Sequence, residues 1–187
     1  MTFESFYKEL DAINALRTNR MRMAKMVLND YSLYDHLFKI AFQVDDPVSS
    51  KACWVLEFVY LDEPEFIIPY LDRFTADLKN LKLDSSIRPL AKISQLMVEA
   101  YFKKKTSKIQ SALTDQHLEL ITEACFDWLI QDEKVAAKVY SMYSLFHLGK
   151  KYDWIHDELR LVIQKDVSNE SAGYKAATRK VLEWIRS

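Results

Sequence analysis

Hydrophobic side chains recur at helical spacing along most of the chain. Ile155, Leu159 and Val162 follow the i, i+4, i+7 pattern that puts apolar side chains on one face of a helix. Residues 52–61 are apolar except for Glu57, and a helix that is apolar nearly all round must be packed between neighbours. The pattern predicts helices over residues 3–15, 18–29, 31–43, 47–61, 64–79, 86–104, 115–130, 133–148, 152–166 and 171–186.

Capping residues precede several of these helices. Asp46 followed by Pro47 predicts an N-cap with proline in the first turn, where its missing N–H costs nothing. Residues 62–65 (Asp-Glu-Pro-Glu) are similar to a capping box. The other predicted N-caps are Thr114, Asp132 and either Ser168 or Asn169.

Two residues predict helix ends or irregularities. Gly149 follows an apolar stripe and occupies the place of a C′ residue. Pro69 lies inside a helical pattern, where it removes a backbone donor and clashes with the preceding turn. We therefore expect a kink there, or a helix that starts late, near Phe66.

The apolar residues after the caps repeat along the chain. Four anchors, separated by 39, 48 and 39 residues, are Val48, Ile87, Val135 and Tyr174. Each has a small or β-branched residue four positions later: Ala52, Ala91, Val139 and Thr178. The longer middle interval coincides with the polar residues 103–108, and a second amphipathic helix follows each of the first three anchors. This predicts stacked helix pairs closed by a single helix.

With this pattern the chain resembles the HEAT/armadillo class, whose units contain two or three helices in about 40–47 residues. The resemblance rests on Asp46-Pro47-Val48…Ala52…Leu56, Asp84…Ile87-Arg88…Ala91, Asp132…Val135…Val139 and Tyr174-Lys175-Ala176-Ala177…Arg179. It implies an all-α fold: a short right-handed α-solenoid of antiparallel helix pairs with nine or ten helices. We expect one domain over residues 1–187, with irregular N-terminal helices over 1–44 and HEAT-like units over 45–187.

The composition removes several classes of enzyme. The 187 residues include two glycines, which excludes glycine-rich dinucleotide fingerprints, Walker loops and Gly-x-Ser-x-Gly elbows. The four histidines form no metal-binding cluster. Asp153 and His156 could face one ligand at i, i+3, but such pairs are common by chance, and an N-cap beside a surface histidine is the favoured explanation. We expect no enzyme activity, no metal and no cofactor.

The cysteines and the apolar runs bear on location. Cys53 and Cys125 lie in apolar stretches and are expected to be buried free thiols; a disulfide or a reactive pair is the alternative. The N-terminus has no basic segment followed by an apolar one, and no run approaches a membrane span. We expect a cytoplasmic protein that binds no membrane.

Three features are candidate binding surfaces. The first is a basic segment that could bind phosphate or form a solvated face: Arg17, Arg20, Arg22 and Lys25. The second is a lysine cluster that could bind an acidic partner or serve solubility: Lys103, Lys104 and Lys105 in the polar residues 103–108. The third is Trp128; the four tryptophans are expected mainly in the core, with one or two lining a concave groove.

The predicted function is a non-catalytic scaffold that binds another protein on a concave helical surface. The first alternative is nucleic-acid binding like that of HEAT-like DNA glycosylases, with Asp127 and Trp128 at the centre; the net charge of −1 disfavours it. The chain also resembles short helical proteins sometimes named adenylosuccinate lyase. The Gly-Ser-Ser-x-Met-Pro-x-Lys loop of true lyases is absent, so a lyase would need a catalytic Ser/His pair from elsewhere.

Overall fold

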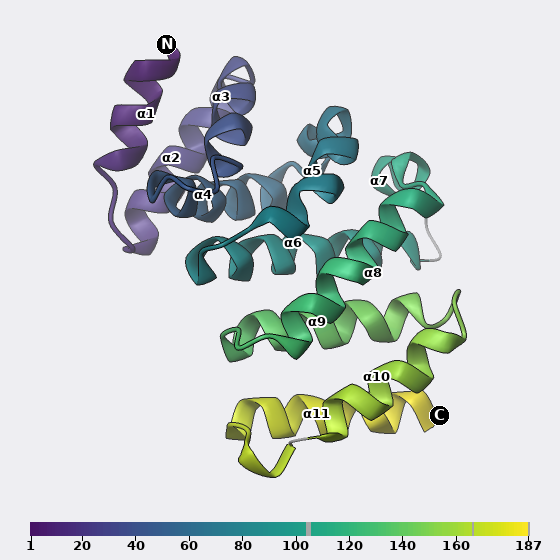
Figure 1. Ribbon diagram of the computed structural model, residues 1–187. Helices are drawn as coiled ribbons and strands as arrows, with labels where there is room; N and C mark the ends of the chain where they lie inside the picture. The colour runs from purple at the N-terminus through teal and green to yellow at the C-terminus, as the bar shows by residue number, and fades with distance from the viewer. Residues whose placement is uncertain (104–105, 166, 187) are drawn as a thin grey trace. The chain divides into compact units, whose positions relative to one another are not determined.

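The computed structural model describes residues 1–103, 106–165 and 167–186. Every regular element in these residues is helical (Figure 1). The α-helices are α1 (Phe3–Asp11), α2 (Arg17–Asn29), α3 (Ser32–Ala41), α4 (Val48–Asp62), α5 (Leu71–Asp77), α6 (Asp84–Tyr101), α7 (Lys108–Ala112), α8 (Asp115–Ile130), α9 (Val135–Leu148), α10 (Trp154–Lys165) and α11 (Ala172–Arg186). Short 3₁₀ helices are η1 (Pro64–Tyr70), η2 (Leu78–Asn80) and η3 (Val167–Asn169). The predicted all-α fold class is confirmed.

The predicted helix positions agree with the structure in most places. The first helix is shorter than predicted, because α1 ends at Asp11 and not at residue 15. Helix α7 was missed: it has five residues and buries only Ile109, so it carries no amphipathic period. The polar residues 103–108 were expected to be a loop, and Lys108 already belongs to α7.

Pro69 interrupts the predicted helix over 64–79. The chain first forms the 3₁₀ helix η1 over Pro64–Tyr70 and becomes α-helical only at Leu71. Of the two expected outcomes the late start occurs, but the α-helix begins after Pro69 and not near Phe66. Proline lacks the N–H for an i→i−4 bond, and the tighter 3₁₀ turn accommodates it.

The chain forms two compact units, Met1–Ile93 and Ser94–Ser187, with the boundary inside α6. In the first unit α1, α2, α3 and η1 all pack against α4 (Figure 1). This explains why α4 is apolar nearly all round, as the sequence predicts. The buried core of the first unit includes Phe6, Leu10, Met23, Val27, Leu37, Phe38, Val55, Leu56, Val59, Ile67 and Phe74.

Two polar contacts connect α4 to the first turns of α6 in this unit. Glu57, the one charged residue in the apolar run, lies 3.1 Å from the Nη1 of Arg88. The indole Nε1 of Trp54 donates to the carbonyl of Ser85 at 2.9 Å. Pro89 has no N–H to satisfy that carbonyl four residues earlier, so Trp54 supplies the missing donor.

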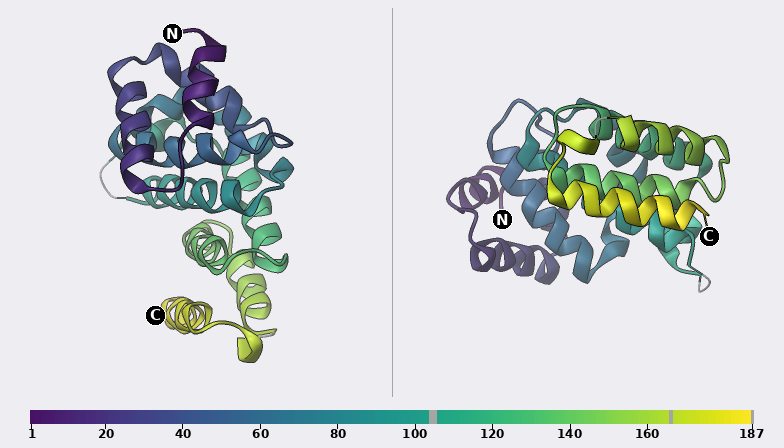
Figure 2. Two further views of the ribbon diagram at one scale, coloured as in Figure 1. Left: turned by 90° about the vertical axis from the view of Figure 1, so that its left-hand side faces the viewer. Right: turned by 90° about the horizontal axis from the view of Figure 1, so that it is seen from below.

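The second unit has α9 at its centre, in contact with α8, α10 and α11. Helices α10 and α11 lie side by side (Figure 2) and α10 also contacts α8. The buried side chains between them include Leu118, Ile121, Cys125, Leu129, Met142, Leu145, Leu148, Ile155, Leu159, Ile163 and Val181. The unit therefore has its own hydrophobic core. Of the predicted α10 stripe, Ile155 and Leu159 are buried in it, whereas Val162 is half-buried.

Two of the predicted N-caps form. The Asp46 carboxylate accepts from the N–H of Val48 at 2.8 Å. Its second oxygen accepts from the hydroxyl of Tyr7, also at 2.8 Å, so this cap also attaches α1 to the start of α4. The Thr114 hydroxyl accepts from the N–H of His117, and the imidazole of His117 accepts from the N–H of Thr114. This reciprocal pair is a capping box in which histidine replaces the usual glutamate.

Three other predicted caps are wrong. Asp132 caps nothing, because α9 begins after Lys134 and has no side-chain cap. Residues 62–65 form no capping box, since Glu63 precedes η1 without a capping bond. At α11 the hydroxyl of Ser171, and not Ser168 or Asn169, accepts from the N–H of Tyr174 at 3.2 Å. The predictions placed these last caps too early because η3 occupies residues 167–169.

Candidate functional site

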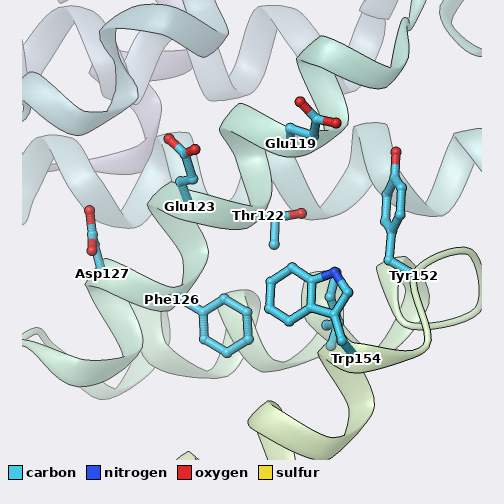
Figure 3. Close-up of a pocket in the computed structure, with 8 residues that line it drawn as sticks. Glu119, Thr122, Glu123, Phe126, Asp127, Tyr152 and Trp154 are labelled. Atoms are coloured by element: carbon cyan, nitrogen blue, oxygen red, sulfur yellow. The ribbon is translucent and has the colours of Figure 1, made fainter.

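A cavity of about 630 Å³ lies in the second unit, between α8 and the start of α10 (Figure 3). Its lining residues are Glu119, Thr122, Glu123, Phe126, Asp127, Tyr152, Trp154 and Ile155. All five residues from α8 fall on one side of that helix, because their spacings are three and four. The cavity combines acidic side chains with aromatic rings, of which Trp154 is exposed and Phe126 and Tyr152 are half-buried.

The acidic side chains form a row along α8. Glu119, Glu123 and Asp127 are four residues apart and all exposed, and Figure 3 shows their carboxylates along one edge of the cavity. None of the three forms an ion pair within the described part of the chain. Like charges at i, i+4 repel one another, so the row carries a local excess of negative charge.

Lys151 pairs with a fourth carboxylate of α8, Asp115, which would otherwise extend the row of unpaired charges. Its ammonium lies 2.5 Å from the carboxylate of Asp115, one turn before Glu119, and donates to the Tyr101 hydroxyl at 2.8 Å. These two hydrogen bonds raise the pKa of Lys151, so its positive charge persists at all physiological pH values. Asp115 is therefore neutralised within the protein, and the uncompensated charge begins at Glu119.

A stacked aromatic pair, the half-buried Phe126 and the exposed Trp154, lies at the other edge of the cavity. The rings of Phe126 and Trp154 are stacked, with centroids 5.9 Å apart and planes at 20°. Trp154 is 57% exposed, although a large apolar ring is usually mostly buried. The next residue, Ile155, is fully buried and fixes the start of α10, so Trp154 is held in place by its backbone and by Phe126.

A second cavity, of about 440 Å³, lies further along α8 and α10 and is also lined by Lys138 of α9 and Tyr174 of α11. Among its lining residues are Ile130 and Leu161, which are 67% and 68% exposed. Ile130 follows Phe126 by one turn on α8, and Leu161 follows Trp154 by two turns on α10. We call the two cavities together the α8–α10 groove. Its first half is acidic and aromatic, and its second half has the aliphatic Ile130 and Leu161 among charged side chains of both signs.

The basic residues of α2 lie in the first unit and are mostly engaged. Arg22 pairs with Glu9 at 3.3 Å. The guanidinium groups of Arg17 and Arg20 both lie 5.5 Å from the ring centroid of Phe58. Lys25 is exposed. The structure thus places the three arginines on aromatic or acidic neighbours of their own unit.

The remaining sequence candidates do not converge on the groove. Lys103 is exposed, while Lys104 and Lys105 lie outside the described residues. Trp128 is 3% exposed, so its ring is part of the core and offers no surface to a partner. The neighbouring Asp127 is exposed in the acidic row, so the two residues do not form one site.

The groups that could be reactive are held in structural contacts. Burial raises the pKa of both Cys53 and Cys125 to about 12, so both are protonated thiols at neutral pH. The predicted free, buried state of both cysteines is confirmed. The Nε2 of His156 lies 2.8 Å from the carbonyl of Phe146, so this histidine closes the end of α9 and is not paired with Asp153 for a ligand. No group of metal-binding side chains occurs in the described ranges.

Sequence reasoning missed the groove, although part of its signal was present. The carboxylates at 119, 123 and 127 already stand at helical spacing in the sequence. What the sequence does not show is that Trp154, predicted mainly as core, is exposed. That depends on α10 beginning at Trp154 itself, with Ile155 as its first buried residue.

The family model of the HEAT repeat domain matches residues 14–185. The chain belongs to this family. The match begins before residue 45, so it includes α2 and α3, for which the sequence shows no clear unit; the predicted division at residue 45 stays a prediction. HEAT repeats commonly mediate protein–protein interaction or scaffolding and are typically non-enzymatic.

Other comparisons add no relative to this HEAT repeat protein. No protein of curated function and no solved structure shows a significant match to it. The second resemblance, to proteins named adenylosuccinate lyase, receives no support. Among the described residues of this HEAT repeat chain, no helix has both the length and the apolar character needed to cross a bilayer.

Proposed function

We propose that this HEAT repeat protein is a non-catalytic binding module that holds a segment of another protein in the α8–α10 groove. The observation that carries the proposal is the exposed Trp154, stacked on Phe126 beside the carboxylates of Glu123 and Asp127. Tryptophan in a partly enclosed site is a common centre of binding energy in protein interfaces. In the second half of the groove, the exposed Ile130 and Leu161 add apolar surface that a partner would cover.

The charge of the groove favours a protein over a nucleic acid as its ligand. Phosphate backbones bind where lysine and arginine gather, whereas the three exposed carboxylates of α8 would repel them. A glycosylase-like centre would need Asp127 and Trp128 together, but Trp128 is buried in the core and Asp127 is exposed. We therefore propose a protein, and not a nucleic acid, as the ligand of the groove.

We also propose a cytoplasmic location. Its support is the chemistry of Cys53 and Cys125, which are both buried thiols. Reducing compartments maintain cysteine in this form.

Site-specific photo-crosslinking in the native cell tests the protein-binding role. A photoreactive amino acid replaces Leu161 in the groove or, as a matched control, the exposed Lys180 of α11. We expect irradiation to give a discrete, protease-sensitive adduct from position 161 and none of that size from position 180. Adducts that disappear with nuclease, or no adduct from position 161, would contradict the proposal.

A further inference from the structure

We infer that the segment bound in the α8–α10 groove is basic: it carries lysine or arginine next to an apolar residue, and it meets Trp154 and the α8 carboxylates together. This inference rests on the proposed function and specifies the partner. It follows from three observations in the second unit: an acidic row that forms no ion pair among the described residues, an aromatic pair whose Trp154 is exposed, and two exposed aliphatic side chains, Ile130 and Leu161, further along the same helices.

Charge complementarity predicts that the bound segment is positively charged. Lys151 neutralises Asp115 at one end of the row, but no cation of the described chain pairs with Glu119, Glu123 or Asp127. An arriving cation would relieve the repulsion between these carboxylates as well as pairing with them. An acidic segment would add to the same repulsion.

The aromatic pair indicates that the positive charge is carried by a lysine or arginine side chain. A lysine or arginine side chain has an apolar stem and a charged head. With its stem over the exposed face of Trp154, it can place its head at the α8 carboxylates and also gain a cation–π contact, which is strongest with tryptophan. The protein makes such contacts elsewhere: the Nζ of Lys180 lies 4.6 Å from the ring centroid of Trp184.

The distance between Trp154 and the exposed Leu161 predicts where a partner makes its second apolar contact. Trp154 and Leu161 are seven residues apart on α10, which corresponds to roughly 10 Å along a helix. A helical segment with apolar residues at i and i+7 places its two side chains at the same interval. Beside Leu161 the cavity has both signs of charge, from Glu158 and Lys165, so that half favours neither sign.

Peptide titration of the full-length protein tests the inference. The probe is a blocked alanine-based helical peptide with two leucines seven residues apart and lysines on the flanking positions. Its twin has glutamate at every lysine position. We expect the lysine peptide to bind at least about tenfold more tightly than the twin at low salt, with an affinity that falls as salt is raised.

Matched variants locate the binding. Glu123→Gln with Asp127→Asn is expected to weaken the lysine peptide by roughly tenfold, as the loss of two exposed ion pairs predicts. The control removes two exposed carboxylates outside both cavities, Asp62→Asn with Glu183→Gln, and is expected to leave affinity unchanged. Trp154→Ala is expected to weaken binding as much, and Trp154→Phe to restore part of it.

Each result decides one of the two proposals. Equal binding of the lysine and glutamate peptides, or equal effects of the two double variants, would overturn the basic partner. Protein adducts from position 161 would then still support the protein-binding role. If the lysine peptide binds as expected but no protein adduct forms in cells, the groove has the inferred chemistry and the cellular role is wrong. Circular dichroism of each variant verifies that it is folded.

Discussion

At Gly149 the α9 helix ends with φ −61° and ψ −15°, a conformation that any residue adopts. The need for glycine comes from packing: a Cβ at this position would overlap the imidazole of His156. That ring is fixed by its bond to the Phe146 carbonyl and by stacking on Phe146, with centroids 5.6 Å apart. The packing of α9 against α10 at this point therefore requires both Gly149 and His156.

Gly149→Ala is expected to destabilise the protein by about 1–3 kcal/mol, the usual cost of forcing an extra methyl into a packed site. In a His156→Ala background the same substitution should cost nothing or stabilise slightly, because alanine is the better helix former. Urea unfolding of the four proteins measures this coupling. Equal costs in the two backgrounds would show that the ring is not the obstacle.

His147 introduces a pH dependence. Burial lowers its pKa, the nearby Lys150 lowers it further, and Glu99 opposes the shift. The folded state therefore prefers neutral His147, and the unfolded state binds a proton more readily below its own pKa of about 6.5. The contribution of His147 to stability is complete above that pH and is lost as the pH falls through the lower folded-state value.

His147→Phe should reduce this acid sensitivity. Phenylalanine keeps an aromatic ring against Phe102, whose centroid is 6.2 Å away, but it cannot take up a proton. We expect the free energy of unfolding to fall less between pH 7.5 and pH 5.5 in the variant than in the wild type, as measured by urea titration. A parallel decline in both proteins would contradict this assignment.

At the scale of elements, caps and prolines decide where helices begin. Thr114 and Asp46 were identifiable from sequence because each cap directly precedes its apolar stripe. The start of α11 was not, because η3 occupies the residues where a cap was expected. At Pro69 the sequence predicts the break, but only the fold decides that a full 3₁₀ segment precedes Leu71.

Paired serine substitutions test the observed start of α11. Ser171→Ala removes the acceptor for the Tyr174 N–H and should cost about 1 kcal/mol, as is usual for an N-cap serine. Ser168→Ala, at one of the two positions that the sequence predicts as the cap, should leave stability unchanged within about 0.5 kcal/mol. Thermal unfolding of both variants measures the difference; a larger cost at position 168 would contradict the observed cap.

At the scale of the whole molecule, sequence pattern predicts the fold class because helical periodicity is a local property. Three of the four repeat anchors are buried: Val48 and Ile87 are 3% and 2% exposed, and Tyr174 is 4% exposed. The fourth, Val135, is only half-buried at the start of α9. The site was harder to predict because exposure depends on neighbours distant in sequence. Trp128 and Trp154 look alike in the sequence, yet one is core and the other is exposed.

The four tryptophans allow the binding claim to be tested in one experiment. Two-dimensional ¹H–¹⁵N NMR of the labelled protein resolves the indole N–H signals of Trp54, Trp128, Trp154 and Trp184, assigned by single replacement with phenylalanine. On titration with the lysine peptide, we predict that the signal of Trp154 moves and that the other three stay in place. A shift of another tryptophan with Trp154 unmoved, or no shift at saturating peptide, would contradict the α8–α10 groove as the binding surface.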